Sequence, residues 1–423
     1  MSRKISLFLL TVVLLISCLG CGKKPSEPVT AEPTDPGAAV IQARRDAAEA
    51  YMRRMATYMW RAEEDVIYTR DSKVLTEEDL AAYEEDDLMP IRAGRLYRGI
   101  PYSYTGASAW NFYDYNSEPD EQGISTLSGV HWRMLNGGSN IGATLGNDCS
   151  SSIQLSWNFV GSKIQLARTS NMTPGFGYLR VGEYSSNDMA NKMTRETCAS
   201  NGENVMSEAY ALLQKADAVV KREETYGHTM MIVENHVVRG EDGTVDMEQS
   251  YITVLHQTST YMKNEEKVFD PKYNEDVYLI YGIDDVYTYA KLFEQGYLPV
   301  TCEVFQNPAP VEEVYVKDSE TEYSYENILK GQFVSNRILS AATIRITDEN
   351  GQVVMEGTCY ERRQDGRNIF SFDLERFTTQ KPELQRGHVA PEELPAGNYH
   401  CTHTVRDAHG EQYTMRDFDF TVS

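Results

Sequence analysis

Residues 146–157 read GNDCSSSIQLSW, which places a cysteine between a turn and a helix. Gly and Asn favour the turn, and the apolar positions after the serines favour a helix over 151–160, so Cys149 is expected at the helix start. Backbone N–H groups and the helix dipole favour negative charge there, which predicts a lowered thiol pKa. Asp148 is expected to cap the same N–H groups, although its charge partly opposes a thiolate.

Two later segments supply the polar groups that a thiol nucleophile needs. Residues 227–233 (GHTMMIV) and 251–257 (YITVLHQ) have the apolar and β-branched character of strands. A nucleophilic cysteine requires a base and a third group that orients the base. His228 is the candidate base. If the two strands pair, His256 or Gln257 lies beside it, and His256 is the preferred third group.

The order of these elements resembles the NlpC-type cell-wall peptidases and the related amidase branch of the papain-like superfamily. The matching segments span residues 99–256, and none of them is specific alone. They are Gly99-Ile100-Pro101-Tyr102, Asp148-Cys149-Ser150, residues 213–220 around Asp217, residues 228–233, and His256.

The resemblance implies an α+β fold with a papain-like cysteine hydrolase domain over residues 91–305. In it Cys149 is the nucleophile that attacks an amide carbonyl, His228 is the base, and His256 orients His228. Tyr102, Asp148 and Ser150 are expected to contact the substrate. The implied substrate is an amide bond in peptidoglycan peptides, and neither a cofactor nor a metal is expected.

The chain also departs from the family pattern. Ser151 and Ala216 each stand where the family has glycine, and the intervals from Tyr102 to Cys149 and from Cys149 to His228 are long. Insertions of this kind usually form loops, and loops around a cleft set specificity. The alternative function is therefore a non-catalytic papain-like lipoprotein that binds a cell-surface ligand. A solute-binding lipoprotein fits poorly, because the chain ends in short strands.

The first residues predict export. Two basic residues precede an apolar run over 5–16, which is too short to span a membrane and is typical of a signal peptide over 1–17. Residues 15–18 resemble a lipobox, so Cys18 is the preferred lipidated residue and Cys21 the second candidate. An ordinary secreted protein is the alternative. Residues 18–38 suit an extended tether. The expected location is extracytoplasmic, anchored to the bacterial cell membrane as a lipoprotein.

Charge and cysteine content limit the possible partners. The formal net charge of −23 argues against nucleic acid, because phosphate backbones need a basic surface. Five cysteines remain beyond the signal region, so at least one thiol is unpaired. A disulfide between Cys359 and Cys401 is left open.

Both flanks of the central domain have their own patterns. Residues 40–62 predict one amphipathic helix in a helical region over 39–90, packed on the catalytic domain rather than on a membrane. Residues 310–423 predict a β-sandwich of immunoglobulin or fibronectin type, with strands at 342–347, 353–356, 398–405 and 416–422 and an Asn-Gly turn within 348–351. His400, His403 and His409 surround Cys401, but strand alternation separates them, so no metal site is expected.

Overall fold

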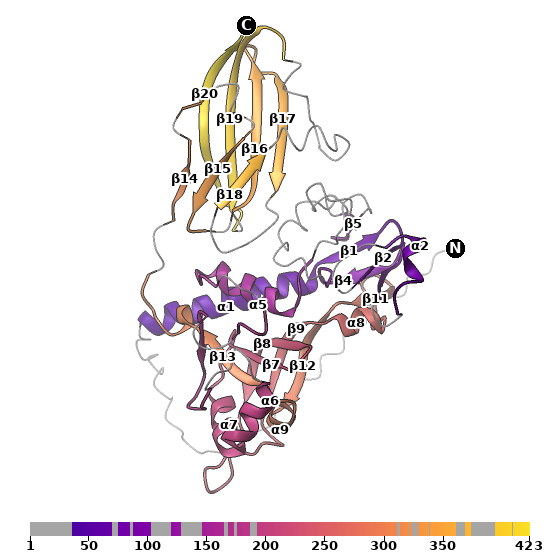
Figure 1. The fold of residues 1–423 in the computed structure, drawn as a ribbon, viewed down its shortest axis with the longest axis vertical. Coiled ribbons are helices and arrows are strands. Elements are labelled where there is room, and N and C mark those ends of the chain that lie inside the picture. Colours follow the sequence, from indigo (N-terminus) through magenta and orange to yellow (C-terminus); the bar gives the residue numbers. More distant parts are fainter. Residues whose placement is uncertain are drawn as a thin grey trace, which may run out of the picture.

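The protein is described by a computed structural model with an α+β fold (Figure 1). The predicted signal peptide over residues 1–17 and the two candidate lipidated residues, Cys18 and Cys21, lie outside the described residues. The described residues are 36–69, 75–84, 88–102, 120–127, 146–164, 168–172, 176–186, 193–310, 314–320, 322–323, 328, 330–337, 339–360, 369–373, 394–407 and 409–423.

A six-stranded sheet forms the centre of the first core. Its strand order is β12-β9-β8-β7-β13-β6, and every neighbouring pair is antiparallel. The central strands are rich in Val, Ile and Met and are buried on both faces. The bounds are β6 Tyr178–Arg180, β7 Ala218–Arg222, β8 Gly227–His236, β9 Tyr251–Gln257, β12 Tyr281–Thr288 and β13 Leu298–Cys302.

Helices cover this sheet. In Figure 1, α1 (Pro36–Thr57) and α5 (Cys149–Phe159) lie along one side of the sheet, while α6 (Thr194–Asn201), α7 (Glu203–Ala211) and α9 (Tyr289–Gln295) gather at its far end. The 3-10 turn η4 (Glu303–Phe305) packs on α1. Buried residues of α1, among them Tyr51, Met52 and Met55, join the core of the sheet. The expected packing of this helix on the domain is therefore confirmed.

The expected helical region over 39–90 is wrong in its second half. The first helix ends at Thr57, and Met59–Ala62 forms β1, because it pairs with β4 (Leu96–Arg98) and β5 (Ser125–Leu127). The full sheet has the order β10-β11-β4-β1-β5, with β10 Lys267–Asp270 and β11 Glu275–Leu279. β2 (Val66–Thr69) and β3 (Leu88–Ile91) form a separate pair, and the described residues also include the short helices α2 (Glu77–Leu80) and α8 (Ser259–Lys263).

The C-terminal part is made of strands, as the sequence predicts. One sheet has the order β14-β15-β18 and the other β17-β16-β19-β20, and both contribute to a second core around Phe333 and Ile344. The turn at Asp348 joins β16 to β17 as expected. The bounds are β14 Val316–Asp318, β15 Lys330–Ser335, β16 Leu339–Asp348, β17 Val353–Tyr360, β18 Ile369–Asp373, β19 Gly397–Asp407 and β20 Gln412–Val422.

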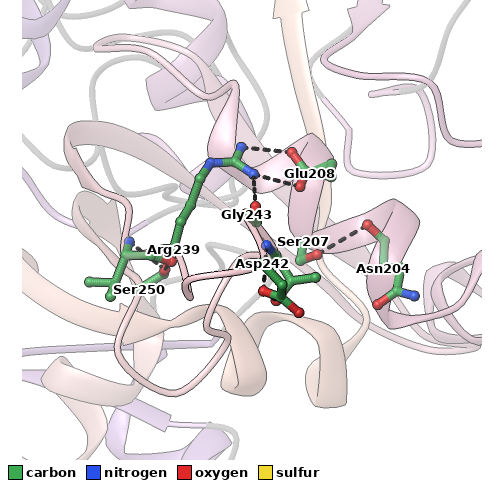
Figure 2. Close-up of polar contacts among 9 residues, drawn as sticks. Asn204, Ser207, Glu208, Arg239, Asp242, Gly243 and Ser250 are labelled. Carbon is green, nitrogen blue, oxygen red and sulfur yellow. Dashed lines mark hydrogen bonds and ion pairs between the residues drawn. The ribbon is translucent and has the colours of Figure 1, made fainter.

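The long connection between β8 and β9 is held against α7. Figure 2 shows Arg239 reaching both carboxylate oxygens of Glu208, at 2.7 Å each, and the carbonyl of Gly243 at 2.8 Å. A bidentate fork of this kind fixes the geometry of two segments far apart in sequence. The register of the two strands that carry His228 and His256 is given by their own pairing, from Met231 opposite Leu255 to His236 opposite Tyr251. Among the described helices, none combines the length and apolar character needed to cross a membrane.

Candidate active site

Cys149 is the first residue of α5, and Asp148 is the N-cap. The Asp148 carboxylate accepts from the Ser151 N–H at 2.7 Å, and the Ser151 hydroxyl accepts from the Asp148 N–H at 2.8 Å. This reciprocal capping box satisfies two backbone donors that a helix start leaves open. Ser151, which stands where the NlpC-type pattern has glycine, is thus one half of the cap.

The thiol of Cys149 lies beside the start of β8. The Thr229 backbone N–H donates a hydrogen bond to the sulfur and acts to lower the thiol pKa. β8 pairs with β9 only from Met231 onward, so Thr229 precedes that ladder, and His228 is the residue immediately before Thr229 on β8. The described interactions of Cys149 do not include a direct hydrogen bond to the His228 ring.

The expected lowering of the Cys149 pKa is wrong. Burial, followed by the negative charge of Asp148, raises the pKa of the Cys149 thiol to about 12. The side chain is only 5% exposed, so desolvation of the charged form outweighs the helix dipole. Burial also raises the pKa of Asp148, against the hydrogen bonds from Ser151 and Ser150.

The structure brings His228 and His256 together. Nε2 of His228 lies 2.8 Å from Nδ1 of His256, and the two rings meet edge to face. Burial, together with the neighbouring His256 and the charge of Lys221, holds the pKa of His228 well below its usual range. His228 is therefore a neutral imidazole near neutral pH, with Nδ1 left for another partner.

Asp285 extends this pair and was missed by the sequence reasoning. Its Oδ2 lies 2.9 Å from Nε2 of His256 and accepts a hydrogen bond from the Tyr261 hydroxyl at 2.7 Å. The hydrogen bond from His256 leads the causes that lower the pKa of Asp285, so the carboxylate is ionised near neutral pH. The described residues thus form one hydrogen-bonded series from His228 through His256 to Asp285.

A β-bulge in β12 puts Asp285 on the correct face. Gly282 pairs with His256 and Ile283 with Leu255, but Asp285 rather than Asp284 pairs with Val254. Asp284 is the extra residue, with a φ of 59°, and its carboxylate faces Arg53 instead. Since side chains alternate along a strand, Asp285 would otherwise point away from His256.

Gly282 leaves room for the His256–Asp285 contact. A Cβ at this position would lie 2.3 Å from Nε2 of His256 and 2.4 Å from Oδ2 of Asp285. Any side chain would therefore displace the ring or the carboxylate. Neither Gly282 nor the bulge has a recognisable signal in the sequence. The only visible sign is the pair of adjacent aspartates at 284 and 285.

Gln257 lies on the opposite face of β9 from His256 and contacts other groups. Its amide nitrogen donates to the carbonyls of Ile100 and Pro101 at 2.9 Å, and its oxygen accepts from the Ser152 hydroxyl at 3.0 Å. Gln257 therefore ties the segment before Tyr102 to α5. Of the two candidates for the third group, His256 is the one in contact with His228.

The three predicted substrate contacts lie close to Cys149. Tyr102 forms a parallel bridge with Asn147, two residues before the cysteine. The Ser150 hydroxyl donates to the Asp148 carboxylate at 2.9 Å, and both side chains belong to the helix cap. Their contact with a substrate stays a prediction.

Asp217, which matches the third element of the NlpC-type pattern, is held by contacts that stabilise the fold. It forms a buried ion pair with Arg45 of α1 at 2.7 Å and also accepts from the Thr301 hydroxyl and the Gln214 N–H. Burial raises the pKa of Asp217 against these contacts. The preceding Ala216 has a φ of 65°, the left-handed region that glycine favours.

Three further cysteines are free thiols as well. Cys198, Cys302 and Cys401 are buried free thiols, so Cys401 does not form the disulfide that the sequence left open. His400 contacts Asp417 and Asp419 at the surface, whereas Cys401 and His403 are buried on the opposite face of β19. No group of three or more potential metal ligands is found among the residues with described positions.

Comparison with known proteins leaves the chain without an assigned family. No family model matches the sequence, and no curated protein matches it. One solved structure that resembles the chain is described as "Crystal structure of tetra-tandem repeat in extending region of large adhesion protein". It is 11% identical, with a TM-score of 0.17, over 49% of this chain and 40% of that chain. A likeness this weak supports no argument about fold or function.

Proposed function

We propose that the protein is a papain-like cysteine hydrolase with Cys149 as nucleophile and His228 as base. One observation supports this most strongly. The Cys149 thiol is hydrogen-bonded to the residue after His228, and His228 is itself hydrogen-bonded to His256. A nucleophile, a base and an orienting group on separate elements are what acyl transfer requires.

Asp285 fixes which nitrogens of the two rings hold protons. An ionised carboxylate can only accept, so Nε2 of His256 donates to it and Nδ1 of His256 is an acceptor. Nε2 of His228 then donates to that acceptor, which leaves the lone pair on Nδ1 of His228. This is the nitrogen that a base beside Cys149 must use.

The chemistry then proceeds from a neutral thiol and imidazole. As the Cys149 sulfur bonds to the amide carbonyl carbon, its proton moves to Nδ1 of His228. The C–N bond breaks, the leaving amine takes that proton, and a thioester remains. Water activated by His228 then releases the acid and regenerates the thiol. The backbone N–H of Cys149 at the helix start supplies a donor for the oxyanion.

The proposed substrate class and location rest on sequence patterns. The resemblance to cell-wall peptidases and the predicted export favour a peptidoglycan peptide, cut by an enzyme anchored outside the cytoplasmic membrane. The C-terminal sheets are proposed to form an immunoglobulin-like sandwich that stands beside the hydrolase domain.

Digestion of purified muropeptides tests this proposal. The wild-type protein should release new peptide products, and Cys149→Ala should release none. Cys401→Ala is the matched control, because it removes a buried free thiol from the other core and should leave the products unchanged. Equal product formation by wild type and Cys149→Ala would rule the proposal out.

The second candidate is a papain-like binding protein without turnover. It is favoured by the burial of Cys149 and by the pKa of about 12, both of which lower the thiolate population. In that case muropeptides bind to the wild type and to Cys149→Ala with the same affinity, and neither protein releases products.

A further inference from the structure

Lys221 lies directly beside His228 on the same face of the six-stranded sheet. The two residues are paired across β7 and β8, so their side chains project together. On the other side of β7, Tyr297 precedes the pairing of Leu298 with Val220, and its ring lies 5.0 Å from the Lys221 ammonium. Tyr297, Lys221 and the proposed base His228 therefore lie next to one another along this region of the sheet.

The ammonium of Lys221 has no carboxylate partner among the described residues. Its hydrogen bond goes to the neutral amide oxygen of Gln295 at 3.2 Å, and the rings of Tyr226 and Tyr297 lie within 6 Å of it. Lys215 and Lys267, in contrast, pair with Asp46 and Asp276 at 3.0 and 2.6 Å. Since the chain has a net charge of −23, carboxylates are abundant elsewhere.

The surroundings of the Lys221 ammonium favour the binding of an anion. The side chain is half-buried, and burial lowers the pKa of Lys221. The charges of Arg195 and Lys291 act in the same direction, while Glu223 opposes them. A partly desolvated cation near other cations costs free energy, and a bound anion would offset that cost. An ammonium has three donors, and Gln295 uses one.

The same region lies close to the nucleophile. The Tyr297 hydroxyl is within electrostatic range of the Cys149 thiol, and the charge of Lys221 acts on His228. We propose that Lys221 binds a carboxylate of the substrate next to the scissile amide. This assignment rests on the proposed hydrolase function and narrows its substrates to acyl or amine groups with a free carboxylate.

Paired alkylating reagents test the site without requiring turnover. Iodoacetate and iodoacetamide react with the same Cys149 sulfur and release iodide, but only iodoacetate carries a carboxylate. The ratio of their rates cancels the thiol pKa, and peptide mass mapping assigns the product to Cys149. In the full chain, the iodoacetate reaction should saturate with concentration, and acetate should compete with it.

Three variants distinguish the effect of the Lys221 charge from a general effect of substitution on the fold. Lys221→Gln should lower the iodoacetate-to-iodoacetamide ratio about fivefold, as expected for loss of one charge a few ångströms away, and should abolish competition by acetate. Lys221→Arg should keep most of the ratio. Lys267→Gln removes a lysine charge elsewhere and should leave the ratio unchanged. An unchanged ratio in Lys221→Gln would overturn the proposal.

If Lys221→Gln does not fold, the salt dependence of the iodoacetate-to-iodoacetamide ratio in the wild type tests the proposal instead. The ratio should fall as ionic strength rises, because salt screens the attraction of iodoacetate to Lys221, and a salt-independent ratio would overturn the assignment. If only the hydrolase proposal fails, the alkylation ratio still responds to Lys221→Gln as described above, but muropeptides give no products. Where turnover is seen, amidation of the substrate carboxylate should raise KM in wild type but not in Lys221→Gln.

Discussion

At the scale of single residues, the ionisation of the thiol and the imidazole sets the chemistry. Burial favours the neutral forms of both Cys149 and His228, so the resting pair is uncharged. The helix dipole, which the sequence places correctly, is outweighed by desolvation. Proton transfer must therefore accompany the attack on the substrate.

This ionisation predicts the pH dependence of activity. A histidine with a depressed pKa is protonated only at acid pH, so kcat/KM should fall as the pH decreases through the lowered pKa of His228. The profile should be flat through neutral pH and bend again only toward about 12, where the thiol ionises. Initial rates from about pH 4 to about pH 10 measure it. An acid limb centred above the usual histidine pKa of about 6.5 would contradict the neutral pair.

The adjacent aspartates provide a matched test of the hydrogen-bonded series. Asp285→Asn should lower kcat about tenfold to a hundredfold, because the amide no longer fixes the protonated nitrogen of His256. Asp284→Asn alters the neighbouring bulge residue, which faces Arg53, and should leave kcat within about twofold.

Nitrogen NMR shifts of the two histidines give a readout beyond activity. In wild type they should show His228 with its proton on Nε2, and Asp285→Asn should produce a mixture of tautomers. Identical shifts in wild type and Asp285→Asn would show that Asp285 does not set the tautomers.

At the scale of elements, helices, strands and turns with strong local sequence patterns could be predicted, but the pairing register of distant strands could not. The helix after Cys149, the strands around His228 and His256, and the hairpin at Asp348 follow from periodicity and turn residues. The contact of Asp285 with His256 depends on a bulge in β12, and β1 depends on pairing with β4 and β5. Such pairings are decided by distant residues, which local sequence patterns do not reveal.

The attachment of α1 to the sheet depends on a buried ion pair. Asp217→Asn should destabilise the protein by about 3 to 5 kcal/mol, because it leaves the Arg45 guanidinium buried without its counter-charge. Urea unfolding followed by tryptophan fluorescence measures this, since Trp60 and Trp157 both lie in the first core.

An exposed pair serves as the control for that measurement. Glu208→Gln weakens the surface contact with Arg239 and should cost less than about 1 kcal/mol. Equal losses in the two variants would show that the Arg45–Asp217 pair does not stabilise the first core.

At the scale of the whole molecule, two separate hydrophobic cores divide the described chain. The first contains the six-stranded sheet with α1 and α5, and the second belongs to the C-terminal sheets. Trp60 and Trp157, the two tryptophans with described positions, both lie in the first core, so their fluorescence reports on that core. Phe159 stacks on His409 at 3.9 Å and links the two parts.

The second core should be sensitive to acid. Burial and the charge of Arg416 lower the pKa of His403 to about 3. In the unfolded chain His403 is protonated below about pH 6.5, whereas in the folded chain it stays neutral down to about pH 3. The free energy of unfolding should therefore decrease as the pH is lowered from about 6.5 to about 3. The loss attributable to His403 is on the order of 5 kcal/mol.

His403→Gln should reduce that loss. Far-ultraviolet circular dichroism follows unfolding of both parts, and tryptophan fluorescence, through Trp60 and Trp157, follows the first core. In the variant, the pH dependence of the dichroism transition should become shallower while the fluorescence transition stays in place. A fluorescence transition that shifts by the same amount would show that the two cores unfold as one unit.

Trapping the acyl-enzyme tests the proposed nucleophile most directly. The full chain is mixed with a muropeptide substrate, quenched in acid during turnover, and mapped by mass spectrometry. The proposal predicts that the peptide containing Cys149 gains the mass of the acyl fragment, and that Cys149→Ala shows neither this adduct nor products. Product release with no adduct on Cys149, and at the same rate in Cys149→Ala, would contradict it.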